Sequence, residues 1–347
     1  MPKHSESETM SSVTTTNPAA TELESASVIA RARVTRVWRP CPTYARIAFR
    51  GAELEAFGTP GRTFDQRIKV LFPPSAGQLP RLSDGGAWYN DWLALPEAER
   101  GAMRTYSIRE LRVDERGTEV IVDFVLHTAP GSTGPAALWA SAAVPGDEVL
   151  LVGPRRGRFD GGGIEFAPGE ASRVLLAGDE TAAPAIARIL EDAPRDLQGE
   201  AFIEMPGRGE TLPIDAPRGV HVHWLGRAHA APGELLVPRV LRGLGAVPGQ
   251  ASSAGLAGAA GAAADADQEL VWETPEYSAL GESLELPPVP QREGRSNGEG
   301  ALDDRYFWIA GESGVVKRLR RHLVRDLGVH RSRVAFMGYW REGVAMR

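Results

Sequence analysis

Residues 174–191 read VLLAGDETAAPAIARILE, and this stretch contains the transition that decides the fold. Its first five residues are apolar or small, as in a strand that is buried on both faces. The apolar residues after Thr181 recur at helical spacing. A buried strand that passes directly into a helix is half of a βαβ unit, so this stretch predicts the start of a parallel α/β sheet.

The same alternation continues toward the C-terminus. Further strands are predicted at 200–205, 219–224, 304–311 and 333–340, and further helices at 233–244 and 313–327. Between them, residues 245–300 are rich in Gly, Ala and Ser and then in Pro and Glu, which predicts a flexible insertion. Since the last strand completes the sheet, we predict one α/β domain over 170–347 that the insertion 245–300 interrupts.

The residues before this domain have the pattern of an antiparallel β-barrel. Strands are predicted at 28–38, 44–50, 67–72, 104–113, 118–126 and 147–152. They are β-branched and partly alternating, and 134–142 is the one helix that we predict among them. We therefore predict a barrel domain over 28–160. Residues 1–27 have no apolar core of signal-peptide length and are predicted to be a disordered tail.

Length and composition limit the possible functions. The 347 residues are enough for two cores, and the net charge of −6 offers no basic field for nucleic acid or anionic lipid. No apolar run reaches the length of a membrane span. Cys41 is the single cysteine, so we expect no disulfide framework, iron–sulfur cluster or metal site within the chain, and a cytoplasmic location.

The segment RTYSIR, residues 104–109, has the residue types that a flavin needs. Strand alternation places Arg104 and Tyr106 on one face and Ser107 on the other. A flavin requires a cation for its diphosphate, an aromatic plane against its ring system and a small hydroxyl or amide near N5. An ordinary surface strand also explains these six letters.

A second segment strengthens the flavin interpretation. Residues 127–140 read HTAPGSTGPAALWA, a Gly- and Pro-rich turn that opens a short helix. Exposed amides at a helix N-terminus, here from Thr133 to Ala136, form an anion site. Such a site suits a diphosphate that Arg104 holds from the other side.

The stretch that opens the α/β domain suits a dinucleotide. Gly178 is predicted at a strand end, Asp179 or Thr181 at a helix N-cap, and Glu180 lies between them. Free amides there can meet a phosphate, although an ordinary strand-to-helix turn gives the same pattern.

Two further turns in this domain also suit a nicotinamide nucleotide. Glu204 can favour a free ribose and Arg208 can receive a 2′-phosphate, so NADPH is slightly favoured over NADH. Glu312, after the strand at 304–311, is a candidate for positioning the nicotinamide. The alternative for that turn is that Ser313 caps the following helix.

Seven segments in order resemble one family. They are DQRIKVLFP (65–73), RTYSIR (104–109), His127 with GPAALWA (134–140), PGDEVLLVGP with its arginines (145–157), LLAGDETAAPAI (175–186), WIAGES (308–313) and GYWREG (338–343). The chain is therefore similar to the siderophore-interacting proteins, FAD-dependent ferric-siderophore reductases related to ferredoxin–NADP reductases. The resemblance implies a flavin-binding barrel and a nicotinamide-binding α/β domain.

The resemblance also implies roles for particular residues. Arg104 would contact the FAD diphosphate, Tyr106 would stack on the flavin and Ser107 would lie near N5. Thr105, between Arg104 and Tyr106, is a further cofactor-binding candidate. The phosphate loop would consist of His127, Thr133, Gly134, Pro135 and Ala136. Ala137 departs from the Ser or Thr that relatives often have there, so one phosphate contact is missing.

Many ferric siderophores are anionic, so cations are expected beside the flavin. The resemblance implies Lys69, Arg155 or Arg156, and Arg341 as substrate ligands. Two other functions fit the same residues: an electron-transfer module that reduced ferredoxin drives, and a flavoprotein that binds siderophores without catalysis.

Overall fold

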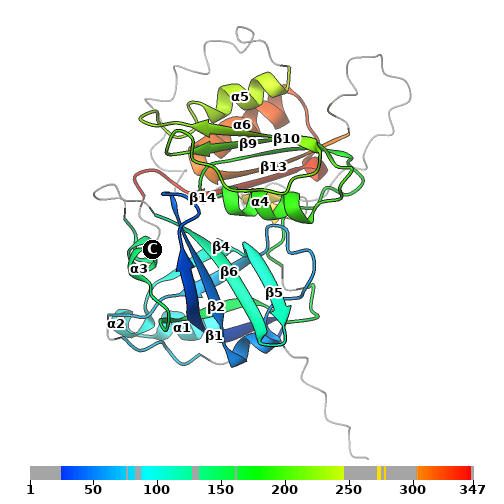
Figure 1. Ribbon diagram of the computed structural model, residues 1–347. Helices are drawn as coiled ribbons and strands as arrows, with labels where there is room; N and C mark the ends of the chain where they lie inside the picture. The colour runs from blue at the N-terminus through cyan, green and yellow to red at the C-terminus, as the bar shows by residue number, and fades with distance from the viewer. Residues whose placement is uncertain are drawn as a thin grey trace, which may run out of the picture.

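The computed structural model describes residues 25–75, 77–82, 87–126, 133–160, 162–245, 272–274, 277–278, 302 and 304–344. Within them the strands form two seven-stranded sheets, one in each half of the chain (Figure 1). Most of the predicted tail, His127 and most of the predicted insertion lie outside the described residues.

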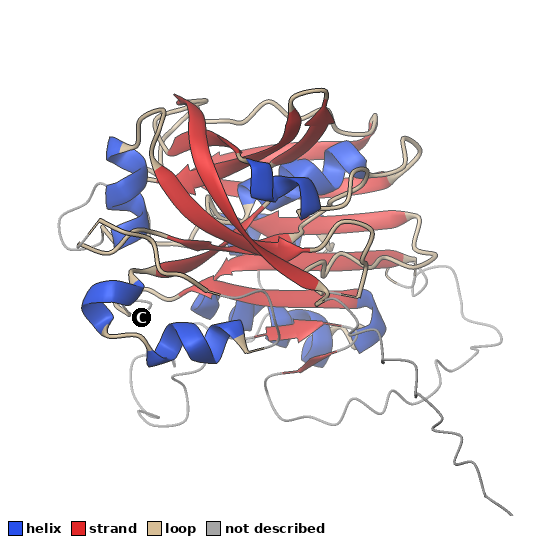
Figure 2. Ribbon diagram, turned by 90° about the horizontal axis from the view of Figure 1, so that it is seen from below, coloured by secondary structure: helices blue, strands red, loops and turns tan. Residues whose placement is uncertain are grey.

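The N-terminal sheet is antiparallel and has the order β4-β3-β7-β1-β2-β6-β5. Its strands are β1 Ser27–Trp38, β2 Tyr44–Arg50, β3 Arg67–Leu71, β4 Met103–Ser107, β5 Glu110–Asp114, β6 Gly117–Val125 and β7 Glu148–Pro154. The sheet curls (Figure 2). The ring of Tyr106 on the outer strand β4 packs on the ring of Phe124 on β6 in the apolar interior, with the ring centroids 4.5 Å apart. Helix α3, Pro135–Ala142, is the helix predicted at 134–142, and it covers this interior.

The single strand predicted at 104–113 is wrong, because two strands occupy this range. Ile108 still donates its N–H to Gln66 beside β3, whereas Arg109 donates to Ile121 on β6. The chain therefore crosses from one edge of the sheet to the other between β4 and β5. The alternation of apolar and polar residues shifts by one position at the crossing, where the polar residues Arg109 and Glu110 are adjacent, and the prediction of a single strand overlooked this shift.

The prediction of one helix in this half is also wrong. A short 3-10 helix, Ala52–Ala56, follows β2, and the helices α1 Trp88–Ala94 and α2 Glu97–Arg100 precede β4. Trp92 of α1 packs with Leu71, Leu150 and Val152 on the outer face of the sheet. These helices are too short for apolar periodicity to reveal them.

The C-terminal sheet has the order β10-β9-β8-β13-β14-β11-β12, and its first five strands are parallel. These are β8 Arg173–Gly178, β9 Gln198–Met205, β10 Gly219–Gly226, β13 Arg305–Glu312 and β14 Val334–Trp340. Helix α4, Ala183–Asp192, packs on one face, and α5 Leu236–Gly243 and α6 Ser313–Arg320 pack on the other (Figure 1). The predicted fold class, an antiparallel β domain followed by a parallel α/β domain, is confirmed.

Two predictions for this half need correction. Part of the predicted insertion is ordered, because β11 Trp272–Thr274 pairs antiparallel with β14, and β12 Tyr277–Ser278 pairs with β11. The last strand of the chain is therefore not the last strand of the sheet. The helix predicted at 313–327 changes to a π-helix over Arg321–Asp326, and a 3-10 turn, Arg331–Arg333, precedes β14.

The two halves share a core. Helix α4 lies between the sheets (Figure 1), and the side chain of Tyr44, at the start of β2, is fully buried among α4-side residues of the α/β domain. No helix in the described residues is both long and apolar enough to cross a membrane.

Candidate functional site

Strand β4 presents the predicted flavin residues at the edge of the barrel. The partly exposed ring of Tyr106 packs on Phe124, and burial raises the pKa of its phenol above the usual range. Arg104, two residues earlier, belongs to the same face and donates from Nη1 to the Met103 carbonyl at 2.7 Å. A cation and an aromatic face therefore lie side by side, as the flavin interpretation requires.

The opposite face of β4 is polar. Thr105 accepts a 2.7 Å hydrogen bond from Lys69 Nζ on β3, and Ser107 is the register partner of Arg67. The hydroxyl of Ser107 therefore lies at the end of β4, where the barrel approaches the α/β domain.

Helix α3 begins at the predicted phosphate turn. Gly134 is its N-cap, Pro135 and Ala136 form its first turn, and no side chain caps it. A Cβ on Gly134 would meet nothing within 4 Å. Trp139 of the same helix packs on Phe124, the ring that also contacts Tyr106. Thr133 precedes this turn within the described residues, and His127 does not belong to them.

These features fit the FAD that the sequence predicts. Among the described residues, the turn at the start of α3 has open space beside Gly134 for a phosphate, and β4 supplies the cation and the aromatic face. Nothing in the described residues fills the space that Gly134 leaves.

The predicted nucleotide residues gather at the carboxyl edge of the parallel sheet. Gly178 ends β8, and a Cβ there would lie 2.5 Å from the Cβ of Ala182, so only glycine allows the tight turn. Arg208 lies in an exposed turn after β9. Open α/β sheets bind their ligands at this edge.

Asp179 has a different role from the predicted helix cap. Helix α4 has Ala182 as its N-cap and no side-chain cap, so the prediction of Asp179 or Thr181 at this position is wrong. The carboxylate of Asp179 instead accepts from the N–H groups of Thr181 and Glu312 and from Trp340 Nε1, at 2.7–2.9 Å. It therefore ties together the ends of β8, β13 and β14. Burial, with the Glu180 carboxylate second, raises the pKa of Asp179 to about 6.

Two glutamates at this edge are fully buried, and hydrogen-bond donors surround the carboxylate of each. Glu180 forms a two-point ion pair with Arg227, which follows β10, at 2.6 and 2.7 Å. Glu204 accepts from the N–H groups of Gly233, Leu235 and Leu236. The expectation that Glu204 favours a ribose is therefore not supported, because these amides at the start of α5 occupy its carboxylate.

The turn after β13 also differs from its prediction. Glu312, and not Ser313, is the N-cap of α6, and its side chain accepts from Val315 N–H at 2.9 Å. Ser313 is buried in the first turn of the helix. Glu312 nevertheless lies at the carboxyl edge, beside Asp179, which is the place that the prediction gave it.

The predicted substrate cations do not all converge. Lys69 lines a cavity of about 290 Å³ with Arg67, Trp88 and Thr105, and burial and the nearby Arg67 lower the pKa of Lys69. Arg155, which follows Pro154 of that cavity, donates to the Ser25 carbonyl.

The other two arginines lie elsewhere. Arg156 donates to the carbonyls of Phe57 and Gly58 and to the Thr118 hydroxyl, and it does not line the cavity. Arg341 follows β14 at the carboxyl edge of the parallel sheet. The structure therefore brings Lys69 and Arg67 together, and not Lys69 with Arg156.

Contacts between the two halves connect the two candidate sites. The guanidinium of Arg67, beside Ser107, lies 4.2 Å from the ring centroid of Trp272, and Trp272 stacks on Tyr339 of β14 at 6.2 Å. Tyr44 donates from its hydroxyl to the Glu180 carbonyl at 2.7 Å. The end of β4 therefore faces the end of β14.

Several residues of this region were not predicted from the sequence. Arg109 is the last residue of RTYSIR and had no assigned role, although its place in the motif was a signal. Arg227 follows the predicted strand 219–224, and a cation at a strand end of a parallel sheet is a signal for a site residue. Tyr44 and Trp272 gave no signal, because their contacts come from the other half of the chain. In the described part of the chain, no three His, Cys, Asp or Glu side chains gather as a metal site.

An antiparallel β domain that is joined to the carboxyl edge of a parallel α/β sheet defines a class of two-domain flavin- and nucleotide-binding folds. Residues 33–158 match the family model "Siderophore-interacting FAD-binding domain", and residues 171–343 match the model "Siderophore-interacting protein". The chain belongs to the siderophore-interacting protein family. The predicted family and its FAD-binding domain are thereby confirmed.

Named relatives agree with the family. An uncharacterized protein of Mycobacterium tuberculosis is 37% identical over 198 residues, a match that spans 55% of this chain and 64% of that protein. Ferric vibriobactin reductase ViuB of Vibrio cholerae is 26% identical and covers 86% of this chain and 84% of its own. The NADPH-dependent ferric-chelate reductase of Escherichia coli is 32% identical over 46% of this chain and 54% of its own.

A solved structure agrees over nearly the whole chain. The siderophore utilization protein from T. fusca superposes with a TM-score of 0.62 at 27% identity. The match covers 93% of this chain and 96% of that one.

Proposed function

We propose that the chain is an FAD-dependent oxidoreductase that reduces ferric siderophores with electrons from NADPH or NADH. Its family and two relatives that are named as ferric reductases support this activity. The main observation behind the proposal is the position of the segment RTYSIR. The strand that presents Arg104 and Tyr106 ends at the interface with the nucleotide domain.

The barrel residues hold the flavin in this proposal. Arg104 and the amides of the turn from Thr133 to Ala136 bind the diphosphate, and Tyr106 stacks on the ring system. Thr105 and Ser107 lie along its edge, with the Ser107 hydroxyl near N5. Bound FAD supplies the chemistry of taking a hydride and passing on single electrons.

The carboxyl edge of the α/β sheet binds the nucleotide in this proposal. The turn at Gly178 and Thr181 meets the phosphates, and Glu180 and Asp179 keep that turn in place through Arg227 and Trp340. Exposed Arg208 receives a 2′-phosphate, which favours NADPH. Glu312 borders the nicotinamide and at the same time caps α6.

The substrate is an anionic ferric chelate in this proposal. Lys69 and Arg67 in the cavity beside β4 provide positive charge, with Arg155 next to it, and Arg341 adds a cation after β14 at the carboxyl edge of the parallel sheet. The siderophore carries its own iron ligands, so the protein needs none. Reduction to Fe(II) weakens hard-oxygen chelation and releases the metal.

The first test is flavin binding. We expect the purified protein to be yellow, with bands at about 380 and 450 nm. Arg104→Ala should weaken FAD binding by roughly 10- to 100-fold, because a charge-assisted contact to the diphosphate is lost. Arg112→Ala on exposed β5 is the matched control and should bind FAD as the wild type does. Equal FAD affinity in both variants would remove Arg104 from the site.

The second test is electron flow. NADPH or NADH should bleach the flavin in a stopped-flow experiment, and added ferric siderophore should restore the colour and produce Fe(II) that ferrozine traps. Bleaching by reduced ferredoxin alone would instead favour a ferredoxin-driven module. Siderophore binding without Fe(II) would favour a non-catalytic binder. A cytoplasmic location, suggested by the single cysteine, remains part of the proposal.

A further inference from the structure

Arg109, the last residue of RTYSIR, connects the flavin strand to the nucleotide domain. Its side chain is almost fully buried, and Nη1 and Nη2 donate to the two carboxylate oxygens of Glu191 at 2.7 and 2.6 Å. Its backbone N–H donates to Ile121 of β6. One residue is therefore fixed to the barrel through its main chain and to helix α4 through its guanidinium.

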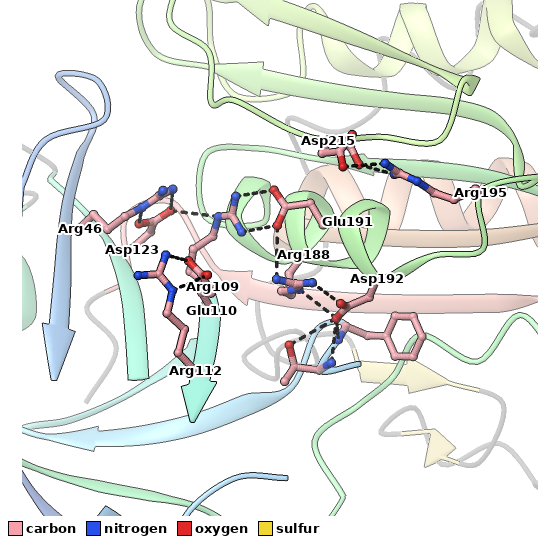
Figure 3. Close-up of polar contacts among 12 residues, drawn as sticks. Arg46, Arg109, Glu110, Arg112, Asp123, Arg188, Glu191, Asp192, Arg195 and Asp215 are labelled. Atoms are coloured by element: carbon pink, nitrogen blue, oxygen red, sulfur yellow. Dashed lines mark hydrogen bonds and ion pairs between the residues drawn. The ribbon is translucent and has the colours of Figure 1, made fainter. Parts of the chain in front are cut away.

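The barrel side of this pair is itself held by charge. Asp123 of β6 lies 3.9 Å from Arg109 Nε, and Arg46 binds both oxygens of Asp123 at 2.6 and 2.7 Å (Figure 3). Asp123 therefore sits between two arginines. This arrangement orients the Arg109 guanidinium toward Glu191.

The helix side has a second attachment. Arg188 contacts Glu191 at 3.4 Å and also pairs with Asp192 (Figure 3). Asp192 accepts from the N–H groups of Thr63 and Phe64 in the barrel at 2.7 and 2.9 Å. The C-terminal end of α4 is thus bound to the barrel at two places.

The other end of α4 carries the nucleotide turn. Tyr44 contacts the Glu180 carbonyl in that turn, so both ends of the helix are held against the barrel. A buried ion pair adds little net stability, because desolvation offsets the attraction, but it demands one geometry. The two-point Arg109–Glu191 pair is therefore suited to fixing orientation.

We propose that the Arg109–Glu191 pair sets the distance between the nicotinamide and the flavin, and that both are positioning residues. This inference rests on the proposed function. Arg109 is two residues from Ser107, and Glu191 belongs to the helix that follows the nucleotide turn. A change at this pair moves one reactant relative to the other without touching either.

The test compares Glu191→Gln, Arg109→Lys and the double variant with the wild-type holoenzyme. At saturating NADPH, the rate of flavin bleaching should fall roughly 10- to 100-fold in each single variant, because small misplacement of reactants is costly. FAD content and NADPH affinity should stay within about twofold. The double variant should be no slower than the single variants, since the residues act as a unit.

Arg195→Gln is the matched control, because Arg195 and Asp215 form an exposed ion pair on the same domain (Figure 3). It should bleach at the wild-type rate. Wild-type bleaching rates in Glu191→Gln and Arg109→Lys would overturn the inference, even if their melting temperatures fell.

If the proposed function is wrong, neither NADPH nor NADH bleaches the flavin of the wild type. Positioning is then measured by hydrogen exchange of the Thr63 and Phe64 amides, which α4 holds. Faster exchange in Glu191→Gln but not in Arg195→Gln supports the positioning role, and equal exchange overturns it.

Discussion

The carboxylate of Asp65 lies fully buried between the two halves of the chain. It precedes β3 and accepts from the N–H groups of Glu165 and Phe166 and from Trp308 Nε1 of β13, at 2.9–3.2 Å. Burial raises its pKa to about 6 despite these donors. No sequence pattern indicates this contact, because Trp308 is 243 residues away.

Because the pKa of Asp65 is raised in the folded state, the contribution of Asp65 to the free energy of unfolding depends on pH. The folded state favours the protonated carboxyl, so its contribution is complete below about pH 4 and is lost as the pH rises through about 6. The unfolding free energy of wild type minus that of Asp65→Asn should fall by about 2 kcal/mol from pH 4 to pH 7. Urea unfolding across this range measures it, and a constant difference would contradict the burial argument.

Residue types were easier to predict from sequence than residue partners. Arg104, Tyr106 and Gly134 lie where the motifs placed them, because strand alternation and a helix start depend on neighbouring residues. Glu204 and Glu312 instead bind backbone amides at helix starts, a role that depends on how the loops fold back.

At the scale of elements, the short strand β11 places an aromatic side chain against Arg67, one of the residues that line the cavity of Lys69. Trp272 lies between the guanidinium of Arg67 and the ring of Tyr339, and Arg67 lines the cavity. The composition of residues 245–300 predicts a flexible insertion, so the strand β11 within this range was not predicted. Its pairing depends on the edge of β14, which periodicity cannot show.

Trp272→Ala should loosen Arg67 in the cavity wall, where Glu165 also holds it by an ion pair. Because a cation–π contact at a partly buried site contributes about 1 kcal/mol, we expect the KM for an anionic ferric siderophore to rise about 3- to 10-fold. Bleaching by NADPH should not change. Trp38→Ala removes a similar contact, with Arg36 at 4.0 Å, far from the cavity and is the control. A KM that is the same in Trp272→Ala and wild type would show that Arg67 does not need the indole.

At the scale of the whole molecule, the two domains behave as one packed body around Tyr44. The fold of each half was predictable, since strand and helix periods are local. The surface where the two halves meet was not predictable. In the sequence, Tyr44 has the pattern of an ordinary barrel-strand residue, and its contact with the α4 side of the other domain is visible only in the structure. The residue limits 28–160 and 170–347 remain predictions for two units that share a core.

Tyr44→Phe tests this shared core. It keeps the ring and removes the hydrogen bond to the Glu180 carbonyl, so we expect a loss of about 1 to 3 kcal/mol in a single unfolding transition. Thermal or urea unfolding by circular dichroism measures it. Tyr89→Phe, on a partly exposed helix residue, should change stability by less than about 0.5 kcal/mol. Two separate transitions would show that the domains unfold independently.

The pairing of β11 with Phe336 and Met337 has one more consequence. Without it, β14 would be the outermost strand, and its backbone donors and acceptors beside two large apolar residues would be a template for another copy of the chain. The strand β11, which belongs to the segment that interrupts the domain, thus covers this edge of β14. We expect this pairing to disfavour self-association through β14.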